Sequence, residues 1–280
     1  MQCSTWADLG IELHRASGEQ RADCPHCTGR SRKTLAANAD TGLFHCHRCG
    51  WSGRIGSASH WLDDYRERIR KADQARDRAR EQATRNAFAL WNAAAPAMWH
   101  PYLKGKAVLP LGIRQRDRRL VVPMFDIDGG LWSCQTIDED GTKLFLRGGR
   151  TTGLFYPIGG FEGFVGAESG GLEIFIAEGF ATGAALHLYF RPHAPVAVAF
   201  NCGNLAHVAN ALRSRYRHAR LVIAADNDQW TDGNPGLTHA RRAADGVGAR
   251  VIYPQFDGLD VSGKPTDFCD LHLLQREMRR

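Results

Sequence analysis

Four cysteines form two closely spaced pairs near the amino terminus of the sequence. Two residues separate Cys24 from Cys27 and two separate Cys46 from Cys49, and eighteen residues lie between the pairs. Each CxxC turn can direct two thiolates at one tetrahedral ion, so this spacing is typical of a four-cysteine zinc ribbon. The sequence therefore predicts one structural Zn²⁺ bound by these four residues.

Two alternatives for the cysteines stay open at this point. His26 and His47 lie inside the turns and could in principle replace a cysteine, or the thiols could pair as disulfides. Disulfides are disfavoured in the reducing compartment that we expect for this chain. The alternation in residues 34–37 and 42–45 predicts a β-hairpin between the two turns.

Carboxylates end two short apolar runs in the second half of the chain. Residues 174–177 lead directly into Glu178, and residues 221–225 lead into Asp226 and Asp228. Helix-like sequence follows each run, which predicts buried parallel strands. Ligands of an open α/β sheet collect at the carboxyl ends of its strands, so we expect these acids to converge at one edge. Three converging carboxylates repel one another unless a cation binds between them, and oxygen ligands of this kind suit Mg²⁺ or Mn²⁺.

A later segment adds acids to the same predicted edge. The strand predicted at residues 250–254 is followed by Asp267 and Asp270. Each aspartate alone would be explained as a turn or helix cap. The order Glu-Gly, then Asp-x-Asp, then a late aspartate pair resembles the TOPRIM domain shared by primases, topoisomerases and some nucleases. That resemblance implies catalytic roles for Glu178, Asp226, Asp228 and Asp267; where bacterial primases often carry a further Asp, this chain has Thr182.

Length and composition bound the protein class. The 280 residues are 43% hydrophobic, which is enough for a real core and predicts two domains. The formal net charge of +6 favours a polyanionic partner. No run of eighteen apolar residues and no signal-peptide core occur, so we expect a cytoplasmic protein without a membrane partner.

The cysteine region also resembles a known domain. Its Cys-Pro-x-Cys turn, a basic segment that includes Arg32 and Lys33, and the second turn at residues 44–50 resemble the amino-terminal zinc-binding domain of phage and bacterial DNA primases. The resemblance implies that this domain helps to select a template site on single-stranded DNA, with Arg32 and Lys33 near the strand. From this segment alone, a purely structural zinc module is an equal alternative.

The region between ribbon and acids divides into two parts. Residues 61–90 carry eight Lys or Arg and six Asp or Glu, which predicts a solvated connecting helix. Strands at residues 120–126 and 131–137, closed by the turn at 128–130, follow amid many cations. This part resembles the amino-terminal half of a primase RNA-polymerase domain. Lys143, Arg147 and Arg150 are the expected contacts to nucleotide or DNA, with a simple exposed charge as the alternative for each.

The expected fold class is α/β, with a small amino-terminal β zinc ribbon followed by a mixed α+β primase core that contains a TOPRIM parallel sheet. We expect a ribbon at residues 1–60, a charged helical linker at 61–92, an amino-terminal polymerase subdomain at 93–170 and a TOPRIM domain at 171–280.

The resemblance, with a likeness to phage- and plasmid-type primases, implies synthesis of short RNA primers on single-stranded DNA from ribonucleoside triphosphates. The alternatives are a TOPRIM nuclease and a non-catalytic DNA-binding module. Residues 258–265 nearly match a P-loop, but Pro265 replaces the required Ser or Thr. We therefore expect no helicase module here, and a separate replicative helicase as partner.

Overall fold

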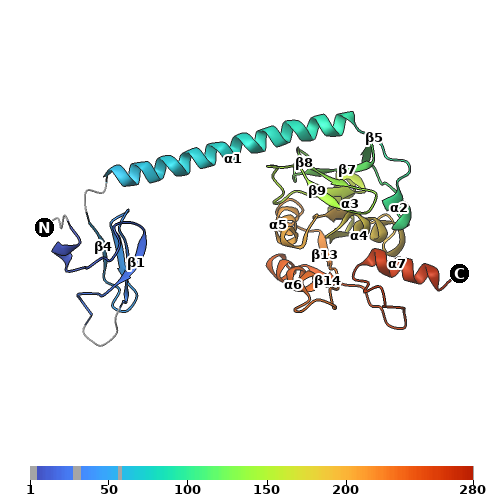
Figure 1. The fold of residues 1–280 in the computed structure, drawn as a ribbon. Coiled ribbons are helices and arrows are strands. Elements are labelled where there is room, and N and C mark those ends of the chain that lie inside the picture. Colours follow the sequence, from blue (N-terminus) through green and yellow to red (C-terminus); the bar gives the residue numbers. More distant parts are fainter. Residues whose placement is uncertain (1–4, 28–32, 56–58, 280) are drawn as a thin grey trace. The chain divides into compact units, whose positions relative to one another are not determined.

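The computed structural model describes residues 5–27, 33–55 and 59–279, and these form two compact units, Met1–Ala75 and Arg76–Arg280 (Figure 1). Each unit has its own hydrophobic core. The 35-residue helix α1 (Ser59–Ala93) supplies residues to both units. No helix in the described ranges is long and apolar enough to cross a membrane.

The first unit is a four-stranded antiparallel sheet in the order β1-β2-β3-β4. The predicted hairpin is confirmed, because Leu35 of β2 pairs with Cys46 of β3. Its core is small, and two of its buried members are the cysteines Cys24 and Cys46. The elements are η1 (Ala7–Leu9), β1 (Glu19–Ala22), β2 (Leu35–Asn38), β3 (Leu43–Cys46) and β4 (Ser52–Arg54).

Helix α1 is longer than the predicted helix, and its second half has a buried face. Ala83 and Ala87 are fully buried, and Ala87 packs with Val121 and Cys134 in one apolar cluster. The Thr84 hydroxyl donates a hydrogen bond to the Trp132 carbonyl at 3.3 Å. The expectation of a solvated helix therefore fails from about Ala83 onward. Small residues at this spacing allow close approach to a sheet, and the surrounding charges concealed that pattern.

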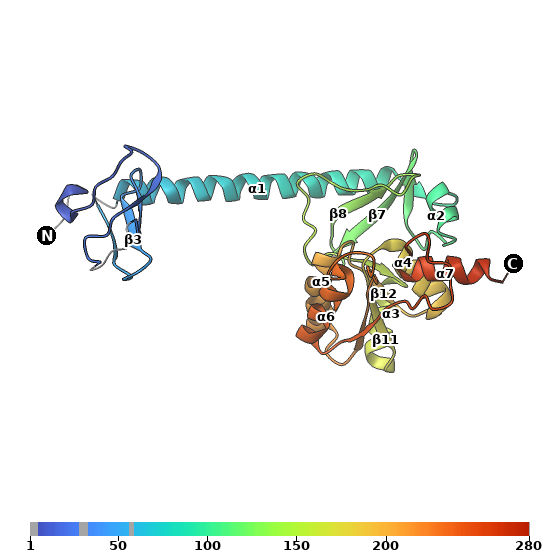
Figure 2. The same cartoon turned by 60° about the horizontal axis from the view of Figure 1, so that its bottom comes forward.

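The second unit contains an antiparallel and a mostly parallel sheet, each five-stranded (Figure 2). The antiparallel sheet has the order β5-β6-β7-β8-β9. Its elements, with one short helix between β5 and β6, are β5 (Ala95–Pro96), α2 (Pro101–Gly105), β6 (Arg114–Arg116), β7 (Arg119–Phe125), β8 (Leu131–Ile137) and β9 (Lys143–Phe145).

The second sheet has the order β10-β12-β11-β13-β14, and all its pairings are parallel except that of β10 with β12. Residues of α3, α5 and α6 are buried on one face, and residues of α4 and α7 on the other. The elements are β10 (Tyr156–Ile158), α3 (Gly160–Gly170), β11 (Glu173–Ala177), α4 (Phe180–Ala185), the π-helical turn η2 (Leu186–Phe190), β12 (Val196–Val198), η3 (Cys202–Asn204), α5 (Leu205–Arg215), β13 (Arg220–Ala224), α6 (Pro235–Val247), β14 (Arg250–Ile252) and α7 (Phe268–Glu277).

Alternation along the strands explains this layering. Ile174 and Ile176 of β11 lie in the cluster with α5 and α6, whereas Phe175 and Ala177 lie in the cluster with α4 and α7. Successive side chains of a strand point to opposite faces, so an unbroken apolar run must be covered on both. The α4 face of this sheet shares its core with Met124 of β7. The predicted fold class is confirmed.

Candidate active site and metal centre

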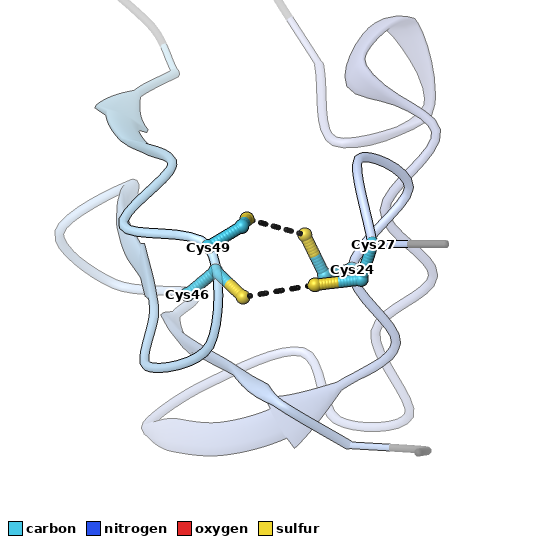
Figure 3. A group of neighbouring side chains, drawn as sticks. All are labelled: Cys24, Cys27, Cys46 and Cys49. Carbon is cyan, nitrogen blue, oxygen red and sulfur yellow. Dashed lines mark hydrogen bonds between the residues drawn. The ribbon is translucent and has the colours of Figure 1, made fainter. Parts of the chain in front are cut away.

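The four predicted zinc ligands come together in the first unit. Their sulfur atoms all lie within 4.8 Å of one another, and no other group of three or more potential ligands in the described ranges is this compact (Figure 3). The Cys24 and Cys49 sulfurs are 3.8 Å apart, and those of Cys27 and Cys46 are 3.5 Å apart. These separations are far longer than a disulfide bond. A tetrahedral ion with Zn–S bonds of about 2.3 Å requires sulfur atoms about 3.8 Å apart, so the cluster fits zinc.

The two histidines of the cysteine turns have other partners. The His26 ring stacks on Trp51 with centroids 4.1 Å apart, and the His47 ring meets His45 edge to face at 5.1 Å. Neither histidine belongs to the compact cluster. The structure therefore supports four sulfur ligands over a mixed set.

The thiols of the cluster differ in their protonation. Burial raises the pKa of Cys24 to about 12. Hydrogen bonding from the Cys49 backbone N–H lowers the pKa of Cys46 to about 5. Metal binding requires thiolates, so a bound ion must displace the proton of Cys24, whereas Cys46 is already a thiolate at neutral pH.

The acids of the second unit lie where the parallel strands end. Glu178 follows β11 directly, and Asp226 and Asp228 follow β13, which pairs in parallel with β11 along its whole length. Asp267 is the amino-terminal cap of α7. Burial raises the pKa of Asp226 to about 8, and repulsion from Asp267, Glu178 and Asp228 adds to this effect. The four acids are thus electrostatic neighbours, although they are not packed as tightly as the cysteines.

Asp226 is the acid that lacks a partner. Its Oδ1 atom is buried and accepts a hydrogen bond from none of the described residues. Buried polar atoms are nearly always satisfied, and exceptions mark strain, function or an ion. Oxygen donors around a buried, unsatisfied carboxylate oxygen suit a divalent cation. The residues present therefore fit a divalent metal.

The remaining acids are held in place by hydrogen bonds. Asp228 Oδ2 accepts from the Gly236 backbone N–H at 2.9 Å, in the first turn of α6. A Cβ at Gly236 would lie 2.7 Å from the Asp226 carbonyl oxygen, so only glycine fits there. Asp267 accepts from the Asp270 N–H at 2.8 Å and from the Thr182 hydroxyl at 3.0 Å. Glu178 has a raised pKa because of its burial and the charge of Asp228, which the Cys202 backbone N–H partly offsets.

The contacts of two further residues at the acid site were not predicted from the sequence. Lys106 Nζ forms an ion pair with Asp270 Oδ1 at 3.2 Å, although the two residues are 164 positions apart in the sequence. Burial works against the Lys106 charge, but Asp267 and Asp270 outweigh it and raise the lysine pKa. Thr182, at the position of the missing aspartate, supplies the hydroxyl that binds Asp267. Only the crowding of cations before residue 150 pointed to Lys106, and nothing in the sequence indicated its partner.

A cavity of about 480 Å³ in the second unit adjoins the acids. Lys143 of β9 lines this cavity next to Gly179. The Lys143 Nζ atom is so close that it would lie 3.5 Å from a Cβ atom placed on Gly179. The Lys143 charge also opposes the raised pKa of Asp226. The lining of the cavity includes Lys106, Lys143, Gly179, Thr182 and Asp267.

The other predicted basic contacts lie elsewhere. The described residues that line this cavity include neither Arg147 nor Arg150. Arg147 is exposed in the loop after β9, and Arg150 lies over the Trp132 ring at 5.2 Å. In the first unit, the Lys33 backbone N–H donates to Asp23 at 2.6 Å. Arg32 lies outside the described residues.

Comparison with known proteins relates the chain to primases. Two curated relatives, each described as DNA primase TraC of Escherichia coli, are 39% and 37% identical to this chain over 163 residues, which is 56% of it. The chain spans 15% of the first relative and 11% of the second. Among solved structures, it is similar to the zinc-binding and RNA-polymerase domains of the Aquifex aeolicus primase, with a TM-score of 0.45 and 16% identity over 96% of this chain and 79% of that chain.

The family comparison locates the acids within a known domain. Residues 173–274 match the family model of the Toprim domain, and this range contains Glu178, Asp226, Asp228 and Asp267. The resemblance to DNA primases predicted from the sequence is confirmed by the relatives and by this match. Residues 173–274 are therefore a Toprim domain.

Proposed function

We propose that this chain is a DNA primase, which joins ribonucleoside triphosphates into short RNA primers on single-stranded DNA. The observation that carries the proposal is the acid edge of the Toprim domain, where the buried Asp226 Oδ1 lacks a partner among the described residues. The lysine-lined cavity beside it can receive a triphosphate. The similarity to the TraC primases supports the same activity.

Glu178, Asp226 and Asp228 would hold Mg²⁺ or Mn²⁺. When bound, such an ion neutralises charge on the reacting phosphate and lowers the pKa of the attacking hydroxyl. Glu178 is suited to accept the proton of that hydroxyl, since its own pKa is raised. Asp267 supports the site with its charge, and the hydrogen bonds from Thr182 and Asp270 fix its orientation.

Lys143 is the basic residue best placed to contact the triphosphate, because it lines the cavity beside Gly179. Arg147 and Arg150 are exposed or half-buried outside that cavity and are proposed to contact the template strand. Arg32 and Lys33 would contact DNA from the zinc ribbon. The ribbon would bind Zn²⁺ through Cys24, Cys27, Cys46 and Cys49, and help to choose the template site.

We assign each proposed role to one of the predicted regions of the chain. We propose a ribbon at residues 1–60, a connecting helix at 61–92, a polymerase subdomain at 93–170 and the Toprim domain at 171–280. Strand β10 (Tyr156–Ile158) already belongs to the Toprim sheet, so the last two regions form one structural body. A cytoplasmic location and a separate replicative helicase complete the proposal.

The test is primer synthesis by the purified chain on single-stranded templates of varied sequence, with labelled ribonucleotides and Mg²⁺ or Mn²⁺. The proposal expects short RNA products that depend on template and divalent metal. Incubation with supercoiled plasmid is the parallel assay for a nuclease. Nicking of the plasmid without RNA synthesis would contradict the proposal and favour hydrolysis at the same acids.

A further inference from the structure

A second cavity lies at the amino-terminal ends of the parallel strands, whereas the acids lie at their carboxyl ends. It has a volume of about 660 Å³, within the range of small-ligand sites. Its lining includes Glu173, Arg220 and Arg250, the first residues of β11, β13 and β14. The acids follow the last residues of β11 and β13, so one strand length of about 15 Å separates the two sites. This cavity is therefore distinct from the proposed active site.

The cavity is rich in cationic donors. Three guanidinium groups line it, from Arg191, Arg220 and Arg250, against the single carboxylate of Glu173. That carboxylate already pairs with Arg250 at 2.8 Å. Within the described part of the chain, Arg191 and Arg220 have no salt bridge to an acid. Arg220 donates to the Gly171 carbonyl and Arg191 to the Phe190 carbonyl. A guanidinium has five N–H donors, so both retain donors for an anion.

Apart from His193, apolar side chains form the rest of the lining. Phe175 is 1% exposed, Phe190 is half-buried, and the Arg191 guanidinium lies 6.0 Å from the Phe175 ring centre. Leu172 is 60% exposed at the rim. A ligand that fits must combine an apolar or aromatic part with a strongly anionic one. Phosphate oxygens match guanidinium donors, and a nucleobase matches a wall of aromatic and aliphatic carbon.

The wall that carries Arg191 is preorganised. The turn after η2 is fixed by hydrogen bonds from the Arg191 N–H to the Leu186 carbonyl at 2.7 Å and from the His193 N–H to the His187 carbonyl at 3.1 Å. The His187 ring Nδ1 is 2.8 Å from the Ala194 carbonyl oxygen. A wall held in this way loses little conformational freedom when a ligand binds.

We propose that this cavity is a second nucleotide site, which binds a nucleoside polyphosphate without a divalent metal. Arg191 and Arg220 bind the phosphates, and the base packs against Phe190 and Leu172. No free carboxylate among the described lining residues is available to hold a cation, so the phosphate charge is balanced by the arginines themselves. The proposal stands apart from primer synthesis, because it concerns binding at the other edge of the sheet.

The test measures binding of a ribose-labelled fluorescent GTP to the full chain by anisotropy, in buffer free of Mg²⁺ and Mn²⁺. The expected result is binding by the unaltered protein that falls about tenfold or more in Arg191→Gln/Arg220→Gln. Arg217→Gln is the matched control, since this exposed arginine lies in the same turn before β13 but outside the cavity lining. It should bind as the unaltered protein does. Asp226→Asn/Asp228→Asn should also bind normally without metal, which separates this site from the active site.

Competition identifies the ligand class. Inorganic triphosphate should displace the probe, and guanosine should do so only at much higher concentration. Equal affinity in Arg191→Gln/Arg220→Gln and the unaltered protein would overturn the proposal, as would an equal loss in Arg217→Gln. Displacement by a single-stranded oligonucleotide as effectively as by triphosphate, at equal phosphate concentration, would also overturn it in favour of a strand-binding groove. Should the double variant unfold at lower temperature, Leu172→Glu at the exposed rim must give the same loss of binding.

Discussion

Individual carboxylates at the ends of the Toprim strands differ in the hydrogen bonds that they accept, and we propose that they differ in function accordingly. Asp267 accepts two and Asp228 accepts one, whereas Asp226 Oδ1 is buried with none from the described residues. A buried acceptor without a donor costs about 1–3 kcal/mol. We therefore propose that a bound cation completes the environment of Asp226.

The first prediction concerns these two acids. Asp226→Asn and Asp228→Asn should each reduce primer synthesis by at least about a hundredfold, because an amide has the same shape but is a weak Mg²⁺ ligand. Circular dichroism should show an unchanged fold. Asp232→Asn, at an exposed acid in the turn that follows, should keep full activity. Full activity in both site variants would refute the assignment.

The second prediction concerns Thr182. Thr182→Val removes the hydroxyl that donates to Asp267 without changing side-chain size, and leaves a carboxylate oxygen short of a donor. We expect the free energy of unfolding in urea to fall by about 1–2 kcal/mol. Thr152→Val, at an exposed threonine, should change it by less than about 0.5 kcal/mol. Equal effects of the two substitutions would mean that the hydrogen bond contributes nothing.

At the scale of elements, the cysteine ribbon depends on its ligands because its core is small. Two of its buried core members are themselves cysteines of the cluster. Structural zinc contributes directly to the folding free energy of such domains. The sheet of the first unit should therefore form only with the ion bound.

Cys46→Ser tests this dependence. Elemental analysis should find about one zinc per chain in the unaltered protein and almost none in the variant, whose ribbon should be digested by protease. Cys202→Ser is the control, since Cys202 follows β12 in the other unit and should leave the zinc content unchanged. Freshly purified, unaltered protein without zinc would contradict the assignment directly.

Helix α1 supplies the fourth prediction. Ala87→Asp places an unpaired carboxylate at a fully buried position against β7 and β8, and should lower the free energy of unfolding of the second unit by about 3 kcal/mol or more. Ala89→Asp, two residues further along the same helix at an exposed position, should have little effect. Thermal denaturation of both variants provides the comparison. Similar melting temperatures would show that the second half of α1 is not part of this core.

Local sequence patterns predicted the strands and turns that position the site. Contacts between residues far apart in the sequence could not be predicted in this way. The apolar runs before Glu178 and Asp226 place both acids, because a strand and its end are local features of the sequence. The pair of CxxC turns is equally local. The Lys106–Asp270 ion pair spans 164 residues, and no local signal marks it. The buried face of α1 was missed because alanines between many charges resemble a solvated helix.

At the scale of the whole molecule, the two units should be separable. A fragment that starts at Arg76 keeps the second half of α1 and the entire second unit, so it should fold alone. We expect it to extend a supplied RNA primer weakly but to lose the preference for particular start sites on a template. A primer-extension assay and a start-site assay, run on the same templates with the full chain, make the comparison. Unchanged site choice by the fragment would show that the ribbon is only structural.

The core that joins the two sheets of the second unit determines how their backbone amides exchange with solvent. Met124 of β7 and Phe175 of β11 are buried in the same cluster, so opening either sheet exposes apolar surface of the other. Amides of β7, β8, β11 and β13 should therefore exchange through one cooperative opening, at the free energy of global unfolding. Amides of β2 and β3 belong to a separate core and should exchange independently, faster once zinc is removed.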